Sequence, residues 1–130
     1  MIEKIRIQNY KSVVDLTLEL GKTNVFIGEN GCGKTNILEA MAMLSGAKND
    51  RLMVQDLVNM GVRVAKPSLT KSAFLSGPKR IKKAIEFEVE MDFSSFKTSL
   101  ISKKNDTIHS EWIDQKKIDF KEGFVDFFVL

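Results

Sequence analysis

Hydrophobic and polar residues alternate along the chain with two periods, one typical of strands and one typical of helices. Residues 2–7 and 14–20 alternate with a period of two, which predicts two half-buried strands joined by a turn at residues 9–12. Because the turn is short, we expect these two strands to be antiparallel. Residues 23–27 (Thr-Asn-Val-Phe-Ile) end in a continuous apolar run and predict a short buried strand.

A helical period follows over residues 34–45. Its apolar positions fall on one stripe, namely Ile37, Leu38, Met41 and Leu44. Gly46 is then expected to follow the last helical turn, where glycine is favoured. A second helix is expected over residues 51–60, closed by Gly61, and a short third helix over residues 67–74.

From residue 84 the period returns to two. Five apolar residues alternate with four acidic ones, and the apolar positions are Ile85, Phe87, Val89, Met91 and Phe93. Such a pattern predicts a strand with one buried and one solvent-facing side. Further strands are expected over residues 107–113, 118–121 and 124–130, so this half of the chain predicts an antiparallel meander.

Length and composition indicate one globular domain. The chain has 130 residues, of which 43% are hydrophobic and 28% charged, a balance that excludes a disordered chain. No apolar run is long enough to span a membrane, and Glu3, Lys4 and Arg6 interrupt the N-terminus where a signal peptide would be apolar. The single cysteine, Cys32, excludes an internal disulfide. These features predict a cytoplasmic protein without a membrane partner.

The net charge of +3 is modest, so it does not by itself indicate a nucleic-acid partner. Basic pairs occur at Lys79-Arg80, Lys82-Lys83, Lys103-Lys104 and Lys116-Lys117. Contact with a nucleic-acid backbone is one interpretation of these pairs. Solvated loop and edge-strand positions are the other, and the absence of interleaved aromatic residues favours it.

The motif with the most specific chemistry is a G-x-x-x-x-G-K-T phosphate-binding loop. Its residues are Gly28, Glu29, Asn30, Gly31, Cys32, Gly33, Lys34 and Thr35. The loop lies between a predicted strand and a predicted helix, which is the setting that this motif requires. Its glycines allow backbone N–H groups to converge on phosphate oxygens. Lys34 is expected to reach the β- and γ-phosphates and the Thr35 hydroxyl to ligate Mg²⁺, so the loop predicts binding of a nucleoside triphosphate with Mg²⁺.

Two segments together are more specific than the loop alone. Residues 5–12 have the sequence Ile-Arg-Ile-Gln-Asn-Tyr-Lys-Ser, and the loop continues over residues 36–40 with Asn-Ile-Leu-Glu-Ala. The pair resembles the N-terminal lobe of the ABC-type ATPases of the SMC, RecF and OLD (overcoming lysogenization defect) group. Asn36 and the Leu-Glu-Ala run resemble the RecF and OLD-like branch. Residues 61–63 and 72–74 are similar, more loosely, to bacterial OLD-like ATPases, including those of antiphage defence systems and retrons.

The resemblance implies a fold class: an α/β P-loop NTPase, specifically the head lobe of an ABC-type ATPase with an antiparallel β subdomain and a few helices. Three parts are then expected along the chain. Residues 1–46 hold the first strands, the loop and its helix, residues 47–80 form a helical insertion, and residues 81–130 form antiparallel strands. The resemblance covers the first 46 residues best.

The resemblance also implies site residues and partners. Lys11 and Ser12 would lie beside the nucleotide, near its base or α-phosphate, and Asn30 through Asn36 would wrap the triphosphate. The cofactors would be ATP and Mg²⁺. Members of the group form head-to-tail dimers that sandwich two ATP molecules, so we expect a homodimer or higher oligomer. An effector protein such as a nuclease, or DNA, would be a further partner.

Parts of a complete ATPase are not identifiable in the sequence. No buried apolar strand ends in the carboxylate that holds Mg²⁺, so no catalytic residue is assigned. The triplets Leu44-Ser45-Gly46 and Leu75-Ser76-Gly77 lack the context of an ABC signature motif. The chain also stops within an apolar run at residues 127–130. We therefore expect the N-terminal lobe of a longer ATPase, which binds nucleotide weakly and hydrolyses it slowly or not at all by itself.

The function expected from the sequence is ATP binding by an OLD- or RecF-like ATPase that gates an effector or DNA-processing activity in antiphage defence. The alternative is an SMC-like head that clamps DNA in repair or chromosome organisation. A transporter ATPase is disfavoured by the turn at residues 9–12 and by Asn36. A lobe that has lost nucleotide binding is disfavoured by the intact Lys34 and Thr35.

Overall fold

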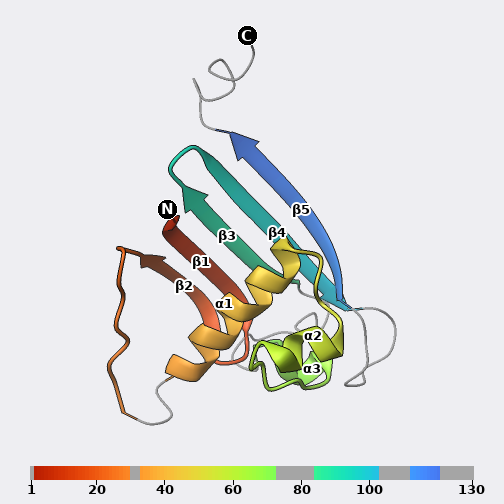
Figure 1. The fold of residues 1–130 in the computed structure, drawn as a ribbon. Helices are drawn as coiled ribbons and strands as arrows, with labels where there is room; N and C mark the ends of the chain where they lie inside the picture. The colour runs from red at the N-terminus through yellow and green to blue at the C-terminus, as the bar shows by residue number, and fades with distance from the viewer. Residues whose placement is uncertain (1, 30–32, 73–83, 103–111, 121–130) are drawn as a thin grey trace.

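The structure is a computed structural model, and it describes residues 2–29, 33–72, 84–102 and 112–120. Its elements in chain order are β1 (Ile2–Tyr10), β2 (Val13–Glu19), α1 (Lys34–Lys48), α2 (Val54–Asn59), α3 (Pro67–Thr70), β3 (Ile85–Met91), β4 (Ser94–Ser102) and β5 (Trp112–Phe120). The five strands form one sheet in the order β2-β1-β3-β4-β5. Every neighbouring pair is antiparallel. Figure 1 shows α1 lying across one face of this sheet, with α2 and α3 beside one end of it.

The sheet joins the first and the last parts of the chain, because β1 pairs with β3. In this pairing Ile5 lies opposite Val89 and Ile7 lies opposite Phe87. These side chains are buried on the face that α1 covers, together with Ala40 and Met43 of the helix and their neighbours. The alternating pattern of the sequence is therefore expressed as one apolar face packed under one helix.

The other face of the sheet is polar and is held together by cross-strand ion pairs. Arg6 on β1 donates two hydrogen bonds to the carboxylate of Asp15 on β2, at 3.0 and 2.8 Å. Lys97 on β4 lies 3.6 Å from Glu88 on β3. Such exposed pairs contribute about 0.2–1 kcal/mol each, so the apolar face carries most of the stability of the sheet.

The predicted strands are confirmed in part. β1 and β2 form the expected antiparallel pair, and β3 has the expected buried and exposed sides. β3 ends at Met91, however, and Phe93 lies in the following turn with 59% of its surface exposed. β4 was not predicted, because Thr98 and several serines interrupt its apolar pattern. β5 is a single strand where two were expected, and the predicted strand at residues 124–130 lies outside the described residues.

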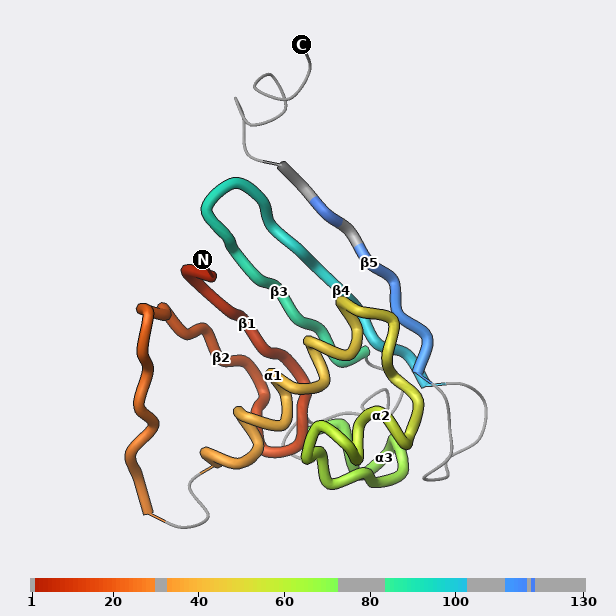
Figure 2. Tube along the Cα trace, viewed as in Figure 1, coloured from red at the N-terminus to blue at the C-terminus, as the bar shows by residue number. Residues whose placement is uncertain are grey.

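The prediction of a buried strand at residues 23–27 is wrong in this structure. These residues have no regular secondary structure, and Val25 and Ile27 are 76% and 89% exposed. In Figure 2 this segment runs away from the sheet as an orange trace at the left. An apolar run becomes a buried strand only where neighbouring strands take up its backbone groups, and the described part of the chain offers it none.

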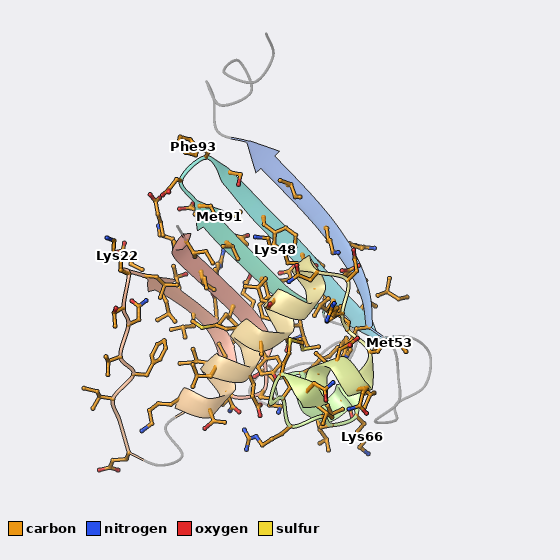
Figure 3. The ribbon with its side chains drawn as sticks, viewed as in Figure 1. Lys22, Lys48, Met53, Lys66, Met91 and Phe93 are labelled. Atoms are coloured by element: carbon orange, nitrogen blue, oxygen red, sulfur yellow. The ribbon has the colours of Figure 1, made fainter. Side chains whose placement is uncertain are left out.

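The helices begin and end differently from the predictions. α1 runs through Gly46 to Lys48, because Gly46 is buried in the helix instead of following it. The buried face of α1 is also displaced from the predicted stripe, since Leu38 is 54% exposed while Glu39 is buried. α2 is shorter than expected, although Gly61 follows it closely, as predicted, with a φ of 87°. Figure 3 labels Lys48 at the end of α1, over the sheet.

Candidate nucleotide-binding site

The phosphate loop leads into the N-terminus of α1, where glycine is required. Gly33 is the residue before the first helical turn and has φ of 103°, a conformation that side-chain-bearing residues rarely adopt. A Cβ atom at Gly33 would also lie 3.4 Å from the Oγ of Ser12. None of the side chains that the structure describes caps the helix at this end. The first N–H groups of α1 are therefore available to an anion, as the motif predicts.

Two further loop residues adjoin this helix end. The Lys34 ammonium group donates a hydrogen bond to the carbonyl oxygen of Gly28, so its side chain spans the loop from one end to the other. An ammonium group has three donors, and this contact leaves others for phosphate oxygens. Thr35 is exposed on the first turn of α1, as a hydroxyl that ligates Mg²⁺ must be. The predicted residues Asn30, Gly31 and Cys32 lie outside the described residues.

The turn between β1 and β2 lies directly against the start of α1. Lys11 adopts a left-handed conformation with φ of 44°, and its backbone N–H donates to the carbonyl of Thr70 at 2.7 Å. Beside it, the Oγ of Ser12 accepts a hydrogen bond from the side-chain amide of Asn36 at 2.6 Å. The fold therefore places Ser12 against Gly33 and Asn36, at the end of the phosphate loop, with Lys11 beside it. Their contact with a nucleotide stays a prediction.

A buried carboxylate joins this turn to a third segment of the chain. The side chain of Glu39 on α1 is only 4% exposed. One of its oxygens accepts from the Lys11 ammonium group at 2.7 Å. The other accepts from the backbone N–H of Arg63 at 3.0 Å and from its Nε at 2.6 Å. Arg63 also donates to the Oδ1 of Asn36 at 3.0 Å, which closes a network from Ser12 through Asn36, Arg63 and Glu39 to Lys11.

Sequence reasoning did not single out Glu39 and Arg63 as site residues. Glu39 carried one signal, since it belongs to the Leu-Glu-Ala run on which the resemblance rests, and the structure shows it buried next to Ala40. A charged side chain in such a position is buried only when it is paired. Arg63 gave no comparable signal, because it lies in a segment without a periodic pattern.

The network shifts the pKa values of Glu39 and Arg63. Burial by itself raises the pKa of Glu39, but the hydrogen bonds from Arg63 and Lys11 outweigh it, so the pKa lies below its ordinary value of 4.5. The hydrogen bond to Glu39 raises the pKa of Arg63. Burial raises the pKa of the neighbouring Tyr10 hydroxyl. Glu39, Arg63 and Tyr10 are therefore anionic, cationic and neutral, respectively, at neutral pH.

The lowered pKa of Glu39 predicts a loss of stability in acid. A carboxylate whose pKa is lower in the folded state stabilises that state above its unfolded pKa, and this contribution disappears as the pH falls through the folded pKa. We expect the melting temperature of the wild-type chain to fall between about pH 5 and pH 3 more steeply than that of Glu39→Gln. Thermal unfolding followed by circular dichroism across this range measures the difference. Parallel pH profiles for the two proteins would contradict the assignment.

A pocket of about 510 Å³ opens beside the network. Its lining combines polar and charged side chains with apolar residues of α3 and of the segment before it, namely Lys11, Ser12, Asn36, Arg63, Val64, Ala65, Leu69 and Lys71. The volume lies in the range of small-molecule sites, roughly 300–1,000 Å³. A pocket with cationic and apolar walls suits a ligand that has both an anionic part and a flat apolar part, as a nucleotide does.

Comparison with known proteins identifies the family. The sequence profile of the family described as the AAA ATPase domain matches residues 1–129. The chain belongs to this ATPase family. In this AAA ATPase domain, the G-x-x-x-x-G-K-T motif lies at the start of α1, and the family assignment supports nucleotide binding.

The chain is also similar in sequence to DNA replication and repair proteins named RecF. RecF of Bacillus cytotoxicus is 38% identical over 98 residues, which cover 68% of this chain and 26% of that protein. RecF of Clostridium botulinum is 38% identical over 93 residues, which cover 70% of this chain and 24% of that protein. The chain therefore spans about a quarter of the length of these relatives. The similarity supports the N-terminal lobe of an ABC-type ATPase of the SMC and RecF group.

The described residues hold neither a cluster of metal-binding side chains nor a membrane-spanning helix. No group of three or more histidine, cysteine, aspartate or glutamate side chains in the described ranges is arranged to hold a metal ion. None of the helices among these residues has both the length and the apolar character of a membrane span.

Proposed function

We propose that the chain binds ATP with Mg²⁺ at the start of α1. The observation that carries the proposal is the meeting of two sequence motifs: Ser12 of the β1–β2 turn lies against Gly33 and accepts a hydrogen bond from Asn36. Residues 13–27 separate the two motifs along the chain, and Lys11 and Ser12 of the first share the wall of one pocket with Asn36, which follows the second.

Each site residue then has a distinct role. The N–H groups of the loop and of the first turn of α1, together with the Lys34 ammonium group, hold the β- and γ-phosphates. Thr35 ligates Mg²⁺ through its hydroxyl oxygen. Lys11, Ser12 and Asn36 face the α-phosphate and the nucleoside, which enters the neighbouring pocket.

Hydrolysis, in this proposal, depends on residues beyond this chain. Phosphoryl transfer needs a carboxylate for Mg²⁺ and a group that orients the attacking water. Head-to-tail dimerisation around two ATP molecules would supply the second half of each site. Gating of an effector in antiphage defence and clamping of DNA by an SMC-like head are alternatives within the proposal, and the similarity to RecF is compatible with both.

Competition between nucleotides tests the proposal. Because the loop is built for the β- and γ-phosphates, ATP with Mg²⁺ is expected to displace a fluorescent ATP analogue at a concentration at least about tenfold lower than AMP. The measurement is the fluorescence anisotropy of the analogue bound to the wild-type chain. Equal potency of ATP and AMP would show that the triphosphate is not recognised.

A further inference from the structure

Among the described residues, Glu39 is the one acidic residue classed as buried. It is not part of the phosphate-loop motif, and its carboxylate does not face solvent. A buried carboxylate is costly unless each oxygen is paired, and here both are. The burial of Glu39 is therefore tolerated because Lys11 and Arg63 pair with its two carboxylate oxygens.

These two cations come from segments that have no regular secondary structure at that point. Lys11 lies in the β1–β2 turn, and Arg63 lies between α2 and α3. Glu39 holds the side chain of the first and both the backbone and the side chain of the second. Both cations line the 510 Å³ pocket. One carboxylate on a rigid helix thus sets the positions of two positive charges on the wall of the pocket.

Arg63 is placed to contact a ligand in addition to Glu39. Its side chain is 65% exposed although its Nε is bound to Glu39. The guanidinium group is planar with donors in a fixed fork, so binding one edge to Glu39 orients the other donors. One of these donors already bonds to Asn36, the residue that follows the predicted Mg²⁺ ligand Thr35.

We propose that Glu39 is a positioning residue that holds Lys11 and Arg63 toward the sugar and α-phosphate of ATP, and that Arg63 is a nucleotide-contacting residue. The inference rests on the proposed function, because it assigns the groups that meet the part of ATP outside the phosphate loop. Glu39 offsets one of these two charges and Lys71 also lines the pocket, so its wall keeps a net positive charge, which suits the anionic ligand.

A purely electrostatic role for Glu39 makes the opposite prediction from a positioning role. If only charge mattered, removing the carboxylate would make the pocket more positive and ATP would bind more tightly. If Glu39 positions the cations, Glu39→Gln loses the geometry along with the charge and ATP binds more weakly. The sign of the change in affinity therefore separates the two roles.

The test is a set of ATP affinities measured by anisotropy on the whole chain. We expect Glu39→Gln to weaken ATP binding about tenfold. In a background where Lys11→Met and Arg63→Gln remove both cations, the same substitution is expected to change the affinity less than about twofold, because Glu39 acts through those residues. The charge-matched control is Glu88→Gln on the opposite face of the sheet, which should bind ATP like the wild-type chain.

Three results would overturn the inference. They are an unchanged or tighter affinity in Glu39→Gln, an equal loss with and without the two cations, and an equal loss in the Glu88→Gln control. If Glu39→Gln does not fold, Arg63→Lys replaces it, because this side chain is largely exposed. Lysine keeps the charge but lacks the planar fork whose separate nitrogens reach Glu39 and Asn36, so we expect about fivefold weaker binding, and wild-type affinity would refute the role of Arg63.

The results distinguish a failure of the proposed ATP binding from a failure of the role proposed for Glu39. A wild-type chain that does not prefer ATP over AMP overturns the proposed function and this inference with it. A wild-type chain that prefers ATP, with Glu39→Gln equal to it, overturns this inference alone.

Discussion

Replacing Lys34 with alanine is expected to weaken ATP binding by about 100-fold. The ammonium group of Lys34 lies at the start of α1 and reaches across the phosphate loop to the carbonyl of Gly28. With ATP present it would donate charge-assisted hydrogen bonds to the β- and γ-phosphates. Hydrogen bonds to charged groups contribute about 1.5–3 kcal/mol each, and a loss of 2.8 kcal/mol is roughly a 100-fold change in affinity.

Lys48 provides the matched control for this substitution. It lies at the other end of the same helix, is exposed, and contacts the sulfur of Met91 at 3.9 Å (Figure 3). Lys48→Ala removes the same charge from α1 without touching the loop, so its ATP affinity should stay within about twofold of the wild type. Equal titrations of a fluorescent ATP analogue into the wild-type chain and Lys34→Ala would show that the loop is not the binding site. Circular dichroism of each variant checks that the fold is retained.

The elements that the sequence predicted well are those in which local pattern and tertiary packing agree. The alternation over residues 85–91 is expressed as β3, because Ile85, Phe87 and Val89 all find the same covered face. The phosphate loop predicted where α1 begins, since Gly33 must have a positive φ there. At these positions the residue type that favours the local conformation is also the one that the packing of the fold requires.

The elements that were missed depend on partners that a local pattern does not contain. Residues 23–27 have the composition of a buried strand, but Val25 and Ile27 are exposed because the described residues provide no neighbouring strand. In β4 the polar residue Thr98 is buried, and its partner in the register is the buried Phe87 of β3.

The candidate site shows the same limit. Lys11, Ser12 and the loop could be proposed from motifs, since each motif is contiguous in the sequence. The link between them could not, because the Glu39 carboxylate meets Lys11 from 28 positions and Arg63 from 24 positions away in the chain. Only the packing of α1 against the sheet brings these three charges together.

Replacing Gly46 with alanine is expected to destabilise the fold by about 2 kcal/mol, although alanine favours helices more than glycine by roughly 1 kcal/mol. Gly46 is buried within α1, and the chain turns back onto it after the helix, where the N–H of Arg51 donates to its carbonyl at 2.7 Å. A Cβ atom would lie 2.6 Å from the carbonyl oxygen of Arg51. Because this is a backbone atom, relief of the clash requires the turn itself to move. The expected fall in melting temperature is about 5–10 °C.

Gly21→Ala is the control that separates this steric effect from the general effect of removing a glycine. At Gly21 the nearest atom to a new Cβ is the carbonyl oxygen of Thr23 at 4.0 Å, an ordinary contact. The substitution is therefore expected to leave the melting temperature within about 2 °C, since fewer unfolded conformations offset any small strain. A Gly46→Ala protein that melts at or above the wild-type temperature would mean that the turn after α1 does not close onto Gly46. Because this turn precedes α2 and the segment that carries Arg63, its displacement should also weaken ATP binding, whereas Gly21→Ala should not.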